Sequence, residues 1–93
     1  MSRLHIIQFI KHAETVLHRV EEYEKSGGHD IPSQDLMTSK RGIQYMIDRV
    51  RNQTLPPKEK RYRTLTRLIN DQWPWGHVLG KQISDLEEEY IHL

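Results

Sequence analysis

Cysteine is absent from the sequence, and this excludes several kinds of site at once. Without thiols the chain can form no disulfide framework, no thiolate zinc site and no cysteine nucleophile. Long hydrophobic runs are absent too, and no segment approaches the roughly 20 apolar residues that span a bilayer. The apolar N-terminal stretch is interrupted by His5, Gln8 and Lys11 and has no small-residue cleavage site, so it does not fit a signal peptide. We therefore expect a cytoplasmic protein without membrane contacts.

Strand-like alternation of apolar and polar residues is the third feature that the sequence lacks. Apolar residues recur instead at intervals of three and four, which is the periodicity of amphipathic helices. A chain of 93 residues has room for one domain with one core, and we take residues 1–93 as that domain. The sequence thus predicts an all-α fold, a small antiparallel bundle of about four amphipathic helices.

The first two helices are predicted from their apolar stripes and their ends. The first covers residues 4–25 and closes at Ser26-Gly27-Gly28, because glycine adopts the left-handed conformation that ends a helix. The second begins either at Ser33 or nearer Ser39, since both places carry N-capping residues. Gly42 weakens its first half, which favours the later start.

Two further helices follow, with a tryptophan corner between them. The third is expected to start at the prolines at 56–57 and to run to about Asn70, with Tyr62 on its apolar side. The chain then turns at Trp73-Pro74-Trp75-Gly76. Gly80 is expected to allow a close approach between helices, because it lacks a side chain. The fourth helix carries one apolar stripe at spacings of four and three: Leu79, Ile83, Leu86, Tyr90 and Leu93.

Charge is polarised along the chain, although the formal net charge is only +1. Residues 40–67 carry nine basic side chains against two acidic ones, whereas residues 84–93 carry four acidic side chains and no Lys or Arg. The simplest explanation is that the two segments pair inside the fold or are merely solvated. The alternatives are a charged face that meets a protein partner or a second copy of the chain, and a phosphate-binding stripe formed by Lys60, Arg63 and Arg67.

Catalytic and metal-binding patterns are weak. Glu14 and His18 lie four residues apart and could supply part of a carboxylate-histidine site, but no HExxH or paired ExxH element completes it. His77 has no nucleophile or paired acid placed near it by the sequence, so we interpret it as a solvent-facing residue of a first helical turn. The segment from Gly76 to Gln82 has the wrong glycine spacing for a phosphate loop. We predict no enzyme activity, no metal and no cofactor.

The two tryptophans beside Pro74 are either core anchors where two helices meet or exposed anchors for a partner. The best-supported function is a small non-catalytic helical interaction module, such as a regulator, adaptor, antitoxin or immunity-type inhibitor. Its candidate contact residues are Glu87, Glu88, Glu89, Trp73 and Trp75. The alternative is a nucleic-acid-binding protein that uses the basic 40–67 segment, although the two-proline connection is too long for a helix-turn-helix. A surplus apolar face on the first helix also favours a homo-oligomer.

Overall fold

The computed structural model describes residues 3–27 and 30–93, and within them the chain is all α-helical. Four α-helices and one short 3-10 turn follow in order: α1 (Arg3–Lys25), α2 (Ser33–Arg51), η1 (Lys58–Lys60), α3 (Thr64–Gln72) and α4 (Val78–Ile91). No strand occurs in this part of the chain. The predicted all-α bundle is therefore confirmed.

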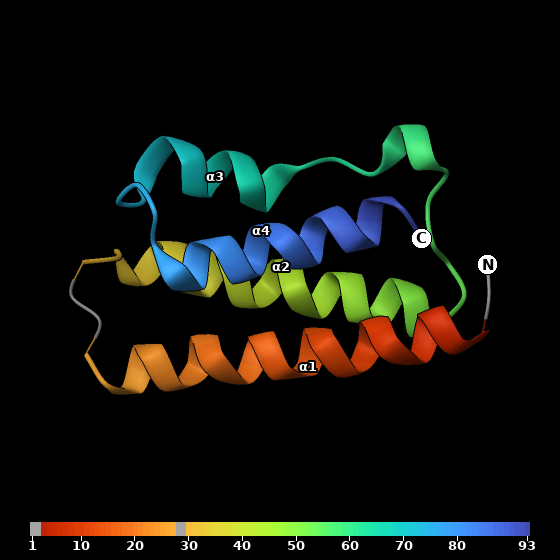
Figure 1. The fold of residues 1–93 in the computed structure, drawn as a ribbon, viewed down its shortest axis with the longest axis horizontal. Coiled ribbons are helices and arrows are strands. Elements are labelled where there is room, and N and C mark those ends of the chain that lie inside the picture. Colours follow the sequence, from red (N-terminus) through yellow and green to blue (C-terminus); the bar gives the residue numbers. More distant parts are fainter. Residues whose placement is uncertain (1–2, 28–29) are drawn as a thin grey trace.

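Successive helices run in alternating directions, so that α1 is antiparallel to α2 and α3 is antiparallel to α4 (Figure 1). Helix α1 packs against both α2 and α4, and α3 packs mainly against α4. The start of α1 and the end of α4 lie at one end of the bundle, and the corner between α3 and α4 lies at the opposite end (Figure 1). This arrangement places the tryptophan segment at a tip of the molecule.

The core is built from the apolar stripes that the sequence predicts. Helices α1, α2 and α4 supply its fully buried large side chains, whose removal from water contributes about 1.5–3 kcal/mol each. The Phe9 and Tyr90 rings join α1 to α4, with their centroids 5.9 Å apart. The fully buried hydrophobic side chains are Phe9, Ala13, Val16, Val20, Ile43, Ile47, Ile83 and Leu86.

Helix α2 begins at the earlier of its two predicted starts, Ser33, with Pro32 at the N-cap position. Gly42 lies inside this helix without breaking it. A Cβ atom at Gly42 would lie only 2.8 Å from the methyl carbons of Leu65, so glycine allows α3 to pack closely on α2. Gly27 has a positive φ of 77° directly after α1, as expected of a helix-ending glycine, whereas Gly28 lies outside the described residues.

The third helix is shorter than predicted. The chain forms only the η1 turn after the prolines, is extended at Arg61, and begins α3 at Thr64. Tyr62, expected on the apolar side of a longer helix, is exposed. The reason is tertiary: the Arg61 guanidinium donates hydrogen bonds to the carbonyls of Pro56 and Ile91, and these bonds fix an extended segment where local periodicity favours a helix.

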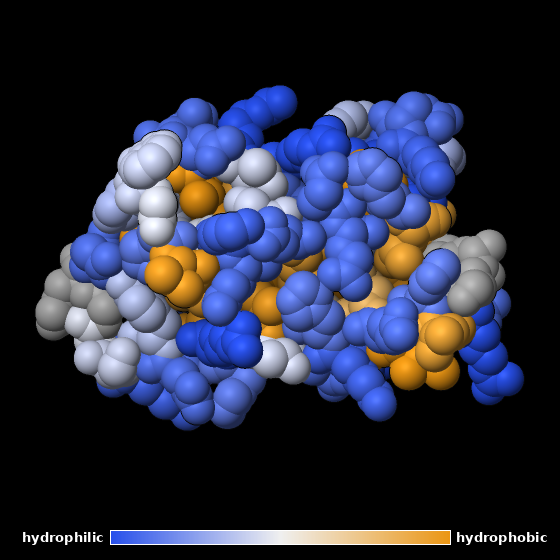
Figure 2. All heavy atoms as spheres, in the orientation of Figure 1, coloured by the Kyte–Doolittle hydropathy of each residue, from blue (hydrophilic) through white to orange (hydrophobic). Residues whose placement is uncertain are grey.

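The surface of the molecule carries separate apolar patches among hydrophilic side chains, as Figure 2 shows for one face. One patch covers the N-terminal end of α1, where Leu4 and Ile7 are exposed. The apolar surplus that the sequence indicates lies instead at Ile6, Ile10, Phe9 and Val16; Phe9 and Val16 are fully buried, and Ile6 and Ile10 are partly buried against the core. Self-association stays a prediction. In the described part of the chain, no helix is both long and apolar enough to cross a bilayer.

Candidate interaction surfaces

The acidic cluster of α4 begins with Glu87, which is buried, with 3% of its surface exposed. Its carboxylate accepts hydrogen bonds from two backbone amides at the start of α3: Leu65 N–H donates to Oε2 (3.0 Å) and Thr66 N–H donates to Oε1 (2.8 Å). The negative charge also lies against the positive end of the α3 dipole. Glu87 therefore holds α3 against α4, and its carboxylate is taken up inside the fold.

The other two glutamates of the cluster have partners within the molecule. Arg63 forms a bidentate pair with Glu88, with its Nε 3.1 Å from Oε2 and its terminal nitrogen 3.2 Å from Oε1. Glu89 lies 2.7 Å from Nδ1 of His12 on α1. The acidic helix thus pairs internally with residues of α1 and of the basic segment, as the simplest explanation of the charge pattern predicts.

The basic residues of the nucleic-acid alternative do not form one helical stripe. Lys60 lies in η1, Arg63 is the N-cap residue of α3, and Arg67 lies inside α3. The stripe was expected on a continuous third helix, and the interruption before Thr64 removes that arrangement. Arg63 is in addition engaged by Glu88, so Lys60 and Arg67 are the members of the set that are exposed and have no partner among the described residues.

The tryptophan corner divides its two indoles between the core and the solvent. Trp73 is 6% exposed and packs against Gly80, where a Cβ would lie 3.2 Å from the indole ring, so the expected close approach at this glycine is confirmed. Trp75 is fully exposed, at 101% of the reference value. Gly76 has a positive φ of 75°, which allows the chain to turn into α4. The corner thus combines a core anchor and a free aromatic side chain.

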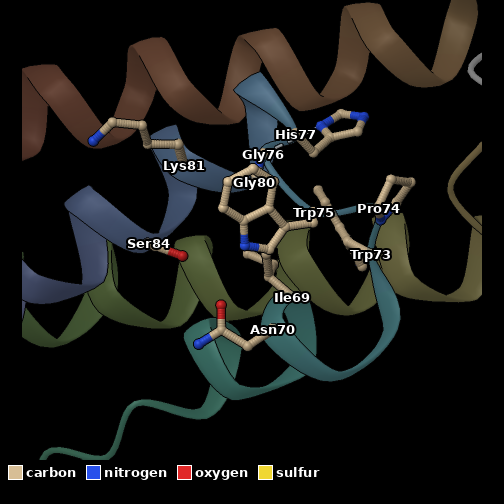
Figure 3. A pocket seen from close by; sticks show the side chains of 10 residues that line it. All are labelled: Ile69, Asn70, Trp73, Pro74, Trp75, Gly76, His77, Gly80, Lys81 and Ser84. Carbon is tan, nitrogen blue, oxygen red and sulfur yellow. Dashed lines mark hydrogen bonds between the residues drawn. The ribbon is translucent and has the colours of Figure 1, made fainter.

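A pocket of about 460 Å³ lies beside this corner (Figure 3). Its walls come from the end of α3, the corner itself and the first turns of α4. The buried Nε1 of Trp73 has no hydrogen-bond partner in the described part of the protein. Ile69, Pro74 and the two indoles give the pocket an apolar character, and Asn70 and Lys81 add polar groups.

His77 links this corner to α1, and our prediction that it faces solvent is wrong. Its side chain is only 11% exposed, and its Nδ1 accepts a hydrogen bond from the Gly80 N–H (3.4 Å), so His77 is the N-cap of α4. The same ring places Nε2 3.1 Å from Oδ2 of Asp30 and 3.1 Å from the Tyr23 hydroxyl. Histidine is not one of the residues usually found at N-cap positions, so the sequence carries no clear signal of this role.

Hydrogen bonding shifts the pKa values of two residues in this cluster. The Tyr23 hydroxyl donates to the Asp30 carboxylate, and this bond, together with burial, raises the pKa of Tyr23 to about 12. The same bond lowers the pKa of Asp30 from its ordinary value of 3.8. The cluster joins α1, the loop before α2 and the start of α4, so it fixes the position of the corner.

Glu14 and His18, the pair considered for metal binding, each contact another side chain. His18 lies 2.9 Å from Glu22 on the same helix, and Glu14 lies 3.9 Å from Arg51 of α2. Among the described residues, no three histidine or carboxylate side chains gather closely enough to hold a metal ion.

A second pocket, of about 560 Å³, lies between α2, the segment before α3, and α4. Sequence reasoning missed it, because its residues come from positions far apart in the chain. Three tyrosines, Tyr45, Tyr62 and Tyr90, contribute to its walls together with the basic residues Arg41, Lys60 and Arg61. Arg49 lies outside this lining, with its guanidinium 5.1 Å from the centre of the Tyr45 ring.

The sequence matches no known protein-family model, and no curated protein gives a significant sequence match. A function for the chain therefore has to be argued from its own surfaces.

Proposed function

We propose that this chain is a small helical protein-interaction module and that Trp75 is its principal contact residue. The observation that carries the proposal is a fully exposed indole on a rigid corner, beside a pocket with an apolar wall. Tryptophan is enriched among the residues that dominate the binding energy of protein interfaces.

The energy available at this corner is large for a single residue. An aromatic side chain of this size buries about 150–250 Å² when it is covered, which corresponds to roughly 4–6 kcal/mol at 25 cal/mol per Å². The corner is held by buried Trp73, by the Gly80 contact and by the His77 cap. A surface that is already ordered loses little entropy on binding, so more of this energy contributes to affinity.

The acidic helix has a smaller part in this proposal than the charge pattern indicates. Glu87 is buried, and the charges of Glu88 and Glu89 already face Arg63 and His12. Exposed ion pairs of this kind contribute about 0–1 kcal/mol, so we assign Glu88 and Glu89 to the rim of an interface. We expect a partner with an apolar or aromatic side chain that enters the pocket beside Trp75, and we expect the two to meet in the cytoplasm.

The test is a capture experiment with three versions of the tagged full-length chain in lysate of its own source. Wild type, Trp75→Ala and Leu4→Ala are compared, with each lysate split into nuclease-treated and untreated halves. Leu4 is a matched control, because it is an exposed apolar residue at the other end of the bundle. Captured proteins and nucleic acid are quantified by mass spectrometry and absorbance.

The expected result is a stoichiometric protein that survives nuclease, is captured by wild type and Leu4→Ala, and is lost with Trp75→Ala. Replacing an exposed side chain changes stability by about 0.5 kcal/mol or less, so the loss would not reflect unfolding. Capture that depends on nucleic acid would contradict the proposal and favour the basic residues instead. Equal capture by all three versions would exclude Trp75 as the contact.

A further inference from the structure

The second pocket shares no lining residue with the tryptophan corner, so it has to be explained separately. Its volume of about 560 Å³ lies within the roughly 300–1,000 Å³ typical of small-molecule sites. Met46 and Leu65 form apolar walls, and the exposed rings of Tyr45 and Tyr62 offer flat faces. Gly42 lies in the same wall, where the Leu65 side chain occupies the space that a Cβ atom would take.

Three cationic side chains line this pocket without an ion-pair partner in the described part of the chain: Arg41, Lys60 and Arg61. Arg61 is held in place, because it donates to the carbonyls of Pro56 (2.7 Å) and Ile91 (3.2 Å). These bonds leave part of its guanidinium free to donate to a ligand. The carboxylate in the lining belongs to Glu87, and both of its oxygens already accept backbone hydrogen bonds.

The Tyr90 hydroxyl is the second observation that points to a ligand. Tyr90 is 3% exposed and lines the pocket, yet its hydroxyl has no hydrogen-bond partner in the described structure. A buried hydroxyl without a partner is costly, so the Tyr90 hydroxyl would be stabilised by an acceptor that a ligand supplies. Burial also raises the pKa of Tyr90, so the hydroxyl keeps its proton and can donate.

We propose that this pocket binds a small organic anion with a flat apolar body, such as an aromatic carboxylate. The body packs against the tyrosine rings and Leu65, the carboxylate pairs with Arg41, Lys60 and Arg61, and the Tyr90 hydroxyl donates to one of its oxygens. Two or more donors on one carboxylate supply specificity for the charge, because a neutral isostere of the same shape leaves the cations unpaired.

The test compares two probes of nearly the same shape, 1-naphthylacetate and its neutral amide, 1-naphthylacetamide. Each is titrated into the ¹⁵N-labelled full chain at low salt, and amide shifts give both the affinity and the location. We expect the carboxylate to bind about tenfold more tightly than the amide, with the largest shifts at Gly42 and Leu65.

Two variants and one control locate the effect. Arg41→Gln with Lys60→Gln should reduce the tenfold preference to about threefold or less, whereas Lys58→Gln with Arg67→Gln removes two exposed cations outside the pocket and should leave the preference unchanged. Tyr90→Phe should weaken carboxylate binding by about three- to tenfold. Because its lost hydroxyl has no partner, Tyr90→Phe should be no less stable than wild type, which separates this loss from unfolding.

Several outcomes would overturn the proposal. Equal affinity for the two probes would show that the cations do not recognise the charge. Shifts confined to residues outside the pocket, equal harm from the control double variant, or unchanged carboxylate binding by Tyr90→Phe would each do the same. None of these outcomes bears on the role of Trp75, whose pocket is built from other residues.

Discussion

The N-terminus of α3 has no capping side chain of its own, because Arg63 occupies the N-cap position and makes no side-chain cap bond. Glu87 of α4, which is 22 residues away from Leu65 in the sequence, caps the helix instead. One carboxylate thus satisfies two orphan amides of a nine-residue helix and attaches it to the bundle. A glutamate in an acidic run is usually solvated, and the sequence alone does not distinguish this one from Glu88 beside it.

We expect Glu87→Ala to reduce the free energy of unfolding by about 2–4 kcal/mol, because it leaves two amides without acceptors in a buried site. Urea denaturation followed by circular dichroism measures the change. Glu88→Ala, which removes an exposed ion pair next to it, is the matched control and should cost about 0–1 kcal/mol. Similar values for the two variants would contradict the capping role of Glu87.

The hydrogen bond between Tyr23 and Asp30 should make stability depend on pH at the acid end. The pKa of Asp30 is lower in the folded chain than its ordinary 3.8, so the unfolded state binds the proton more tightly. The stabilisation is therefore present above about pH 4 and is lost as the pH falls further. We expect the stability difference between wild type and Tyr23→Phe to be constant from about pH 5 to 9 and to shrink below pH 4.

Thermal melts of both proteins at each pH give that difference directly. At alkaline pH the titrating group is Tyr23, whose pKa is raised to about 12 in the folded chain. The folded state therefore holds the Tyr23 proton more tightly than the unfolded state does, and the stabilisation from this hydrogen bond fades only as the pH rises above 10. A difference that stays unchanged down to pH 2.5 would exclude Asp30 as the partner that matters.

At the scale of whole elements, the corner between α3 and α4 depends on how closely the two helices approach. A Cβ at Gly80 would lie 2.9 Å from Cγ2 of Ile69 and 3.2 Å from the Trp73 ring. Neither neighbour yields easily, because one is a stiff β-branched side chain and the other a buried ring. Glycine in a helix normally costs stability, and here the contact explains its presence.

Gly80→Ala should therefore destabilise the protein by about 1–2 kcal/mol, although alanine is the better helix former by about 1 kcal/mol. Ser84→Ala, one turn further along α4, should be neutral or slightly stabilising. Chemical denaturation of the two variants side by side provides the comparison. A more stable Gly80→Ala protein would mean that Ile69 and Trp73 move apart at little cost.

The helices differ in how far their bounds can be predicted from the sequence. The bounds of α1 and the apolar stripes of α2 and α4 follow from repeating apolar residues over several turns. The start of α2 does not: Gly42 favours the later start near Ser39, whereas the helix begins at Ser33, because Gly42 is accommodated by its contact with Leu65. The start of α3 cannot be predicted from the local sequence pattern, because Glu87 and Arg61 determine it through contacts with distant parts of the chain.

The candidate site divides likewise. The sequence singles out the tryptophan pair but does not tell exposed Trp75 from buried Trp73, and the pocket at Tyr90 requires three segments of the chain to come together.

For the whole molecule, one buried cluster draws side chains from all four α-helices, which predicts that the protein unfolds in a single transition. The variant Trp75→Phe leaves Trp73 as the only indole, and its fluorescence then reports the α3–α4 corner. We expect the urea midpoint from this fluorescence to coincide with the midpoint from far-ultraviolet circular dichroism. An earlier fluorescence transition would show that α3 detaches before the rest.

The start of α1 and the end of α4 lie at one end of a molecule 38 Å long, and the Trp75 corner lies at the other (Figure 1). Anything joined to either terminus is thus held away from the exposed indole by the length of the bundle. A chain attached through its ends would expose Trp75 at the far end of the molecule. The attached group and a partner bound at Trp75 would then lie on opposite ends of the bundle, so neither would block the other.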